Sequence, residues 1–288
     1  MTPERSMVHR LEQYYDAVPR RRARTERVGP FTLFVADAGW PYYARPALGG
    51  SEEIRTSDVR RVLDRQRELD VPRSIEWVDE VTPGLAATVE TAGVRVARCP
   101  LLVLVGAPKG SPGTVLMLSP DEVDALVATR AAISVSFAYG GNATADAGIE
   151  ARDAELKSAR KEVDARFLTD LRSGASRMAA AFAPGVGQGE LAPTGGGRYS
   201  SDGAAELGPV GGGSYSPVGN VAEIAGVGVL PAYRRRGLAA QLSYVLATDA
   251  LTRGVTTVFC SAESDDVARV YQAVGFCRVG TACIAEAT

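Results

Sequence analysis

The stretch EIAGVGVLPAYRRRGLAAQL, from Glu223 to Leu242, decides the fold of the C-terminal half of the chain. An apolar run typical of a strand passes through a turn with three arginines and a glycine into a run typical of a helix. The first N–H groups of a helix have no partners within it, and the helix dipole adds partial positive charge there. The turn is therefore a candidate anion site. The arginines suit a ligand with several phosphates, and a solvated basic turn is the alternative interpretation.

The composition indicates a soluble globular protein. The chain has 288 residues, of which 45% are hydrophobic, and this is enough for one large core or two ordinary ones. The 32 basic and 34 acidic residues leave a net charge of -2, which gives no field for holding nucleic acid or an acidic membrane. We find no apolar run of membrane-spanning length and no signal peptide. We therefore expect two folded units, a cytoplasmic location, and neither nucleic acid nor a membrane as a partner.

The cysteine and histidine content limits the chemistry. The four cysteines lie in or beside apolar runs without the C-x-x-C spacing of zinc sites or redox dithiols, so we expect them to be reduced and buried: Cys99, Cys260, Cys277 and Cys283. His9 is the single histidine of the sequence. We therefore expect no metal, and we expect carboxylates, tyrosines or water to move protons.

The C-terminal half has the most regular pattern. Its last third predicts a strand at 221–229, a helix at 236–252, a strand at 255–260, a helix at 264–274 and a strand at 276–285. Before it we expect a helix within 121–138 and a longer one over 149–182. The apolar stripe of the longer helix is either core or a face for another helix. The Gly-, Ser- and Pro-rich segment 184–220 predicts short strands joined by mobile loops.

The N-terminal half predicts a smaller unit. Residues 1–29 suggest a polar helical lead-in with a basic end, followed by a strand at 31–36 and a helix that carries Val59, Val62, Leu63 and Leu69 on one face. A strand over 74–78, a helix from an N-cap at Thr82 to Gly93, and a strand over 94–105 complete it. The Gly- and Pro-rich segment 106–113 marks a boundary, so we expect domains at 1–112 and 113–288.

The two halves repeat one order of elements. Residues 57–105 and the C-terminal third both read helix, strand, helix, strand. VETAGVRVARC, which starts at Val89, has the shape of YQAVGFCRVGT, which starts at Tyr271, because each is a helix stopped by Gly and followed at once by a strand. Two copies of one fold or a shared topology alone would explain this.

The turn and the helix after it resemble a known family. VGVLPAYRRRGLA, residues 227–239, is similar to the acetyl-CoA-binding signature of the GNAT superfamily of N-acyltransferases, where an Arg/Gln-x-x-Gly-x-Gly/Ala turn holds the coenzyme A pyrophosphate. Arg234, Gly237 and Ala239 match it, and YQAVGF resembles the Tyr-x-x-x-Gly-Phe of the family. The resemblance is clear over 221–285, weaker over 113–220 and only topological over 1–112.

The fold class follows from this resemblance. It implies an α/β (α+β) protein with a GNAT-like mixed, mostly antiparallel sheet flanked by helices, and a smaller N-terminal α/β unit of related topology. The chain would then be a tandem form with a degenerate N-terminal half.

The resemblance also implies which residues bind the acyl donor. The backbone of Val227, Gly228 and Val229 would pair with the pantetheine arm, since that strand splays from its neighbour. The pyrophosphate would be held by the turn residues Arg234, Arg235, Arg236, Gly237, Leu238 and Ala239. Ser264 stands near the usual place of an Asn that contacts coenzyme A and could replace part of its hydrogen bonding. The acidic residues after it, Asp265 and Asp266, would weaken binding of a phosphate-bearing ligand.

Two residues are candidates for the catalytic proton transfers. Tyr271 falls where the family commonly has a tyrosine that protonates the departing thiolate, and a core aromatic residue is the alternative interpretation. Attack on a thioester needs a neutral amine, so a base must accept its proton. Glu223 lies at a distance from the turn like that of the general base in some family members, and an exposed or structurally paired glutamate is the alternative.

The N-terminal half lacks these features. It has no Arg-x-x-Gly-x-Ala turn, and Val89 stands where Tyr271 stands in the C-terminal half. Without phosphate-binding amides or a proton donor it should not bind acyl-CoA. The aromatic loop with Trp40, Tyr42 and Tyr43 could present rings to an acceptor, or it could simply pack.

These observations favour an enzyme, an acyl-CoA-dependent N-acetyltransferase that moves the acetyl group of acetyl-CoA to a primary amine by direct attack. One alternative is a non-catalytic acyl-CoA-binding regulatory module. Another is a nucleic-acid binder that uses Arg20 to Arg22 with Arg234 to Arg236, and the net charge argues against it. The identity of the amine and the oligomeric state, a homodimer included, stay open.

Overall fold

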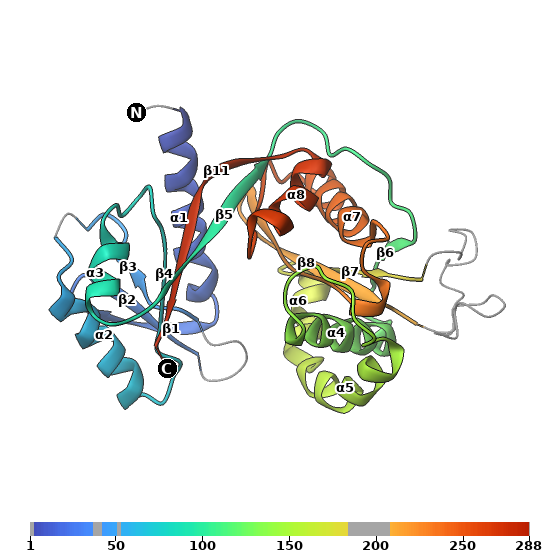
Figure 1. The fold of residues 1–288 in the computed structure, drawn as a ribbon, viewed down its shortest axis with the longest axis horizontal. Coiled ribbons are helices and arrows are strands. Elements are labelled where there is room, and N and C mark those ends of the chain that lie inside the picture. The colour runs from blue at the N-terminus through green and yellow to red at the C-terminus, as the bar shows by residue number, and fades with distance from the viewer. Residues whose placement is uncertain (1–2, 37–41, 51–52, 184–207, 288) are drawn as a thin grey trace. The chain divides into compact units, whose positions relative to one another are not determined.

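The chain forms two compact units. The computed structural model describes residues 3–36, 42–50, 53–183 and 208–287. The N-terminal unit comprises Met1–Leu102, Ser261–Glu263 and Arg278–Thr288, and the C-terminal unit comprises Val103–Cys260 and Ser264–Cys277. The last strand thus begins in the C-terminal unit and ends in the N-terminal one (Figure 1). The predicted domain ranges 1–112 and 113–288 stay a prediction, since this division by contacts is not a single cut.

The N-terminal unit contains two small groups of strands. A three-stranded sheet has the order β1, β2, β3, and β4 pairs antiparallel with β11. In chain order the elements are α1 (Pro3–Arg20), β1 (Ala23–Val28), β2 (Phe31–Ala36), β3 (Arg45–Pro46), α2 (Thr56–Glu68), β4 (Ser74–Val78), α3 (Leu85–Thr91) and β5 (Val96–Leu104), followed at the end of the chain by β11 (Phe276–Glu286). Its core gathers apolar side chains of β2, α2, β4 and α3, among them the fully buried Trp77.

The C-terminal unit is built on one larger sheet. Its strands lie in the order β10, β9, β8, β7, β6, and every neighbouring pair is antiparallel except β9 with β10. In chain order the elements are β6 (Val115–Met117), α4 (Val123–Ala138), α5 (Ile149–Glu162), α6 (Ala165–Ser173), β7 (Arg177–Ala181), β8 (Gly211–Val218), β9 (Val221–Val229), the 3-10 turn η3 (Pro231–Tyr233), α7 (Leu238–Thr252), β10 (Thr257–Ser261) and α8 (Asp265–Val274).

Helices cover both faces of this sheet. Side chains alternate between the faces of a strand, so neighbouring positions of β8 meet different helices. A Cβ at Gly212 would lie 2.2 Å from Thr129 of α4, and one at Gly213 would lie 3.1 Å from Leu246 of α7. Helices α4 and α7 therefore pack on opposite faces, as Figure 1 shows, and the glycines of β8 let both helices approach closely.

The predicted fold class is confirmed, because the sheet is mixed, mostly antiparallel and flanked by helices. The predicted helix over 149–182 is wrong in its length. Asp164 caps α6 by accepting a hydrogen bond from the Phe167 N–H at 2.7 Å, and Gly174 ends that helix with φ +75°. The chain then enters β7, so Met178 of the predicted helical stripe lies on a strand, where it is buried in the core with Leu171.

The structure differs from two further expectations and describes only part of a third segment. The basic end predicted for the first helix is strand β1 instead, because α1 stops at Arg20. The N-cap of α3 is Gly84 and not Thr82. Most of the Gly-rich segment, residues 184–207, lies outside the described residues, and the part that follows includes β8. In the described ranges, no helix is both long and apolar enough to span a bilayer.

Candidate active site

Strand β9 separates from β10 halfway along its length. The two strands pair in parallel only over Val221–Glu223, opposite Thr257–Phe259, although β9 continues to Val229. On its other edge β9 has an irregularity: Gly228 pairs with Gly212 and Ala225 with Ser214, so two residues of β9 oppose one of β8. Gly226, with φ +65°, supplies the left-handed residue of this bulge. The end of β9 therefore presents backbone groups that β10 does not use.

The three residues predicted to pair with a pantetheine arm lie on this part of β9. Gly228 and Val229 are buried and Val227 is half-buried. A Cβ at Gly228 would lie 2.1 Å from the Ser136 Oγ of α4, so the packing of α4 alone requires glycine there. The sequence analysis did not single out Gly226, although a second glycine inside a strand pattern is a signal for a bulge.

The turn before α7 leaves a row of backbone N–H groups open. Gly237 is the N-cap of α7, and no side chain caps this end. Among the described residues, no backbone carbonyl accepts from the N–H groups of Arg235 to Ala240. Arg235 and Gly237 have φ values of +63° and +79°, with Arg236 between them outside that region. Such alternation turns successive N–H groups toward one point and forms a concave anion site.

The three arginines of the turn differ in their contacts. Arg235 and Arg236 are exposed, and the Arg236 guanidinium lies 5.3 Å from the centre of the Tyr233 ring. Arg234 is half-buried, and its guanidinium donates hydrogen bonds to four backbone carbonyls of the same unit. Leu238 is buried in the core, so it offers the turn only its backbone, and Ala239 is small and half-buried.

Ser264 is the N-cap of α8, and its hydroxyl accepts a hydrogen bond from the Val267 N–H at 3.4 Å. The cap explains why a serine suits this position without any ligand. Asp265 and Asp266 occupy the first turn of α8, where the helix dipole favours carboxylates, and Asp266 forms an ion pair with Arg269.

Tyr271 is a buried side chain of α8 that packs edge-on against Phe276, with ring centres 5.7 Å apart. Burial raises the pKa of its phenol well above the ordinary value, and the nearby Cys260 and Glu223 raise it further. The phenol therefore keeps its proton at neutral pH. Within the described parts of the chain, its oxygen has no hydrogen-bond partner.

Glu223 is half-buried at the last paired position of β9, opposite Phe259 of β10. Its charge acts on Tyr271 and on the fully buried Cys260. Burial and this carboxylate both raise the pKa of the Cys260 thiol, which therefore stays neutral. The structure thus brings Glu223 and Tyr271 within electrostatic reach of each other where β9 and β10 part. The expectation of buried cysteines holds for Cys260, whose place beside this pair was not predicted, and it is wrong for Cys277, which is exposed on β11.

The corresponding parts of the N-terminal unit are built differently. Val89 is fully buried on α3. Trp40 lies outside the described residues, and Tyr42 is half-buried and in contact with other groups. The Tyr43 hydroxyl donates to Glu286 at 3.3 Å, and burial raises the pKa of its phenol. The aromatic loop is therefore at least partly packed.

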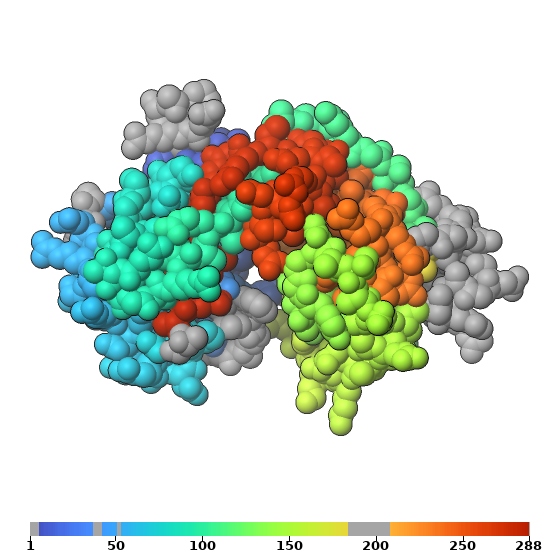
Figure 2. All heavy atoms as spheres, viewed as in Figure 1, coloured from blue at the N-terminus to red at the C-terminus, as the bar shows by residue number. Residues whose placement is uncertain are grey.

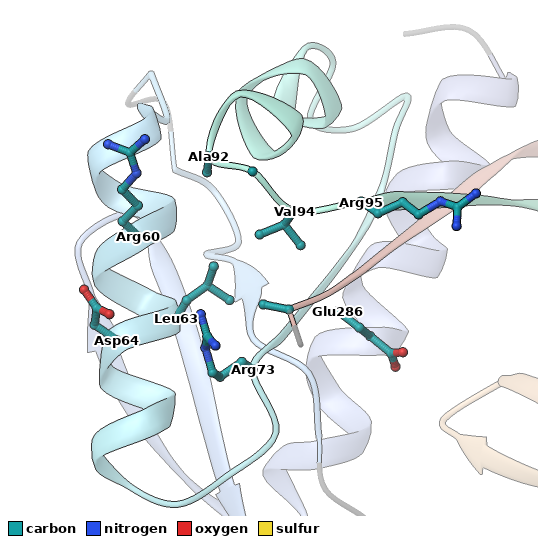
Figure 3. Close-up of a pocket in the computed structure, with 10 residues that line it drawn as sticks. Arg60, Leu63, Asp64, Arg73, Ala92, Val94, Arg95 and Glu286 are labelled. Carbon is teal, nitrogen blue, oxygen red and sulfur yellow. The ribbon is translucent and has the colours of Figure 1, made fainter.

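A pocket of about 400 Å³ lies in the N-terminal unit between α2, the turn after α3 and the end of β11. Leu63 and Val94 form part of its wall (Figure 3). Figure 3 shows the Arg73 side chain beside Leu63, whereas Arg95 and Glu286 point away from this space. The charged residues of its lining thus differ in direction, and we assign no ligand to this pocket.

In the space-filling view (Figure 2), the residues of α7, in orange, lie next to those of α8, in red. No group of three or more histidine, cysteine or acidic side chains that could hold a metal ion occurs in the part of the chain that the structure describes. The expectation that the protein works without a metal stays a prediction.

Comparisons with known proteins agree with this geometry. Residues 190–276 match the model of the acetyltransferase (GNAT) family. A GCN5-related N-acetyltransferase from Kribbella flavida has a similar structure, with a TM-score of 0.62, 19% identity and coverage of 97% of this chain and 95% of that one. A tandem GNAT protein from the clavulanic acid biosynthesis pathway also has a similar structure, with a TM-score of 0.50, 17% identity and coverage of 89% of this chain and 78% of that one. Curated protein sequences gave no match. The chain therefore contains a domain of the acetyltransferase (GNAT) family and has the fold of tandem GNAT proteins.

Proposed function

We propose that the C-terminal unit transfers an acetyl group from acetyl-CoA to a primary amine by direct attack. The observation that carries the proposal is the uncapped start of α7. Its N–H groups from Arg235 to Ala240 have no backbone carbonyl partner among the described residues, and they follow closely in the chain on β9, the strand that has separated from its neighbour. A diphosphate on those amides would leave the pantetheine arm of the same molecule free to run along β9.

The phosphate site combines three favourable contributions. Hydrogen bonds from backbone amides to a charged oxygen each contribute about 1.5–3 kcal/mol. The dipole of α7, a helix of 15 residues, adds partial positive charge at this end. The exposed Arg235 and Arg236 can add charge-assisted bonds from the solvent side.

The reaction assigns one proton transfer to each of two side chains. The amine nitrogen attacks the thioester carbonyl carbon, and Glu223 accepts the proton that the nitrogen loses, directly or through water. A backbone N–H at the end of β9 stabilises the developing oxyanion. When the C–S bond breaks, Tyr271 gives its proton to the thiolate. Glu223 then releases the proton it accepted and Tyr271 takes up one through solvent, so both side chains regain their starting protonation and the products are a neutral amide and a thiol.

Ligand binding is the first experiment. Coenzyme A should raise the melting temperature, since a ligand that binds only the native state stabilises it, whereas inorganic phosphate at the same concentration should have a much smaller effect. No shift with coenzyme A would exclude the proposed donor. This arm does not require the acceptor to be known.

Turnover is the second experiment. Thiol release from acetyl-CoA with a panel of small amines, aminoglycosides and peptides should identify an acceptor. Glu223→Gln should then lower turnover but leave coenzyme A binding unchanged, whereas Glu150→Gln, an exposed glutamate in the first turn of α5, should change neither. Binding of coenzyme A with no thiol release from any acceptor would favour the acyl-CoA-binding regulatory module instead.

A further inference from the structure

The guanidinium of Arg234 donates hydrogen bonds to three parts of the C-terminal unit. Its Nε donates to the Val229 carbonyl at 3.2 Å, at the end of β9. Its Nη2 donates to the Ser136 carbonyl at 2.8 Å, in the last turn of α4. Its Nη1 donates to the carbonyls of Gly140 at 2.9 Å and Ala143 at 2.8 Å, in the connection between α4 and α5.

These contacts occupy the guanidinium with protein. Four of the five N–H donors of an arginine side chain are used by the four carbonyls. The Ser136 carbonyl belongs to the last turn of α4, where a helix leaves its carbonyls without internal partners. Arg234 thus satisfies a helix end and a loop at once, and most of its donors are already used by backbone carbonyls of the protein.

The connection between α4 and α5, residues 139–148, has a second link to the same turn. The Ala232 N–H, in η3, donates to the Ala147 carbonyl at 3.1 Å. The segment that Arg234 holds also carries two exposed aromatic side chains, Phe137 at 58% and Tyr139 at 56% exposure. Exposed rings on a loop keep one position only if the backbone beneath them is fixed.

We infer that Arg234 is a positioning residue that fixes the end of α4 and the α4–α5 connection to the phosphate-binding turn, and not a ligand of the diphosphate. The backbone N–H groups that follow it bind the phosphates, and Arg234 sets where the last turn of α4 with Phe137 and the connection with Tyr139 lie relative to them. Only the consequence for acceptor binding rests on the proposed function. The contacts themselves stand without it.

Hydrogen exchange of the amides of 137–148 tests the inference without any ligand. Arg234→Gln removes the guanidinium, and Arg234→Lys keeps the charge but not the planar fork that reaches several carbonyls. Both variants should speed exchange in this segment by roughly fivefold or more, while exchange in β7 and β8 stays unchanged as a check on folding. The matched control is Arg236→Gln, since Arg236 is exposed and has one long bond of 3.4 Å to the Ala232 carbonyl. A smaller change in either Arg234 variant would overturn the inference.

The affinity for coenzyme A gives an independent arm. If Arg234 is not a phosphate ligand, the dissociation constant should rise less in Arg234→Gln than in Arg236→Gln, and an equal or larger rise would overturn the inference. With an acceptor amine, the KM for the amine should rise while the KM for acetyl-CoA changes less. If coenzyme A does not bind the wild-type protein, the proposed function fails, and the exchange arm still decides the role of Arg234.

Discussion

The two units begin corresponding helices in opposite ways. In the N-terminal unit, Asp58 in the first turn of α2 accepts a hydrogen bond from the Arg55 N–H at 3.0 Å, so a carboxylate of the protein already occupies the positive end of the helix. In the C-terminal unit, the first turn of α7 holds no acidic residue and Gly237 offers no capping side chain. The N-terminus of α2 thus has a carboxylate of the protein beside it, whereas the N-terminal amides of α7 are open to an anion from a ligand.

The second difference lies on the following helix. Val89 of α3 is fully buried and apolar, whereas Tyr271 of α8 is buried but carries a phenol whose pKa is raised. The two units therefore share the order helix, strand, helix, strand, and within it the cap of the first helix and one side chain of the second differ in their polar groups. The order of elements therefore sets the positions of the residues, while a few polar groups decide whether a unit can act on a ligand.

Removing the phenol should have the largest effect. Tyr271→Phe keeps the packing against Phe276 and should lower turnover by about 10²- to 10⁴-fold, the range typical of general acid catalysis. Steady-state rates with acetyl-CoA measure this. The control is Tyr215→Phe, which removes the hydroxyl that donates to Asp249 at 2.6 Å. It should reduce stability by about 1 kcal/mol and leave turnover unchanged. If Tyr271→Phe turns over like the wild type, Tyr271 is not the acid.

Giving α7 the cap of α2 should abolish the difference between the two helices. Ala240 occupies the third position of α7, as Asp58 does in α2. Ala240→Asp should weaken coenzyme A binding about 10- to 100-fold, because the carboxylate satisfies an open amide and repels phosphate. Calorimetry with Ala240→Asn as the neutral control measures this. Equal affinities for the two variants would show that this helix end does not hold the phosphates.

The reverse change should act on stability alone. Asp58→Ala removes the protein's own anion from α2 and should cost about 1 kcal/mol in the free energy of unfolding. Chemical denaturation measures the loss, and the affinity for coenzyme A should not change. A weaker affinity in this variant would place part of the donor site in the N-terminal unit.

The smallest expected effect is a difference in acid sensitivity. Burial raises the pKa of Asp249, but hydrogen bonds from Tyr215 and Arg253 outweigh it, so that pKa lies below its ordinary value. The resulting stabilisation is present above about pH 4 and is lost as the pH falls through the folded-state pKa. In the N-terminal unit, burial raises the pKa of Glu76 despite Arg45, so its folded state takes up a proton first and gains stability from protonation.

Two spectroscopic signals separate the units in this test. Both tryptophans, Trp40 and Trp77, belong to the N-terminal unit, so their fluorescence reports it, whereas circular dichroism reports both units. As the pH is lowered below about 4, the denaturation midpoint measured by circular dichroism should decrease before the denaturation midpoint measured by fluorescence. Asp249→Asn should remove part of this difference. Denaturation midpoints that decrease together in the wild type would contradict the assignment of the acid-sensitive carboxylate to the C-terminal unit.

Much of the fold could be predicted from local sequence patterns. The strand predicted at 221–229 coincides with β9, and the helix predicted at 264–274 begins one residue before α8, because apolar periodicity and Gly275 mark these elements. The break between α5 and α6 was not predicted, because the apolar stripe continues through it. The residue that caps α6, Asp164, is of a type that also occurs inside helices.

The site was predictable in its backbone and less so in its side chains. The turn before α7 follows from a glycine and the strand-to-helix order. The role of Arg234 depends on carbonyls about 90 or more positions away, at Ser136 and Gly140, which no local pattern encodes. The pairing of β11 with β4 likewise depends on a partner some 200 residues earlier in the sequence.

The structure of a complex with coenzyme A would show which groups of the protein hold the diphosphate. We expect diphosphate oxygens within about 2.7 to 3.2 Å of the backbone nitrogens of Arg235 to Ala240, with the guanidinium of Arg234 still bonded to its four carbonyls. A complex in which the diphosphate lies elsewhere and those amides face only solvent would contradict it.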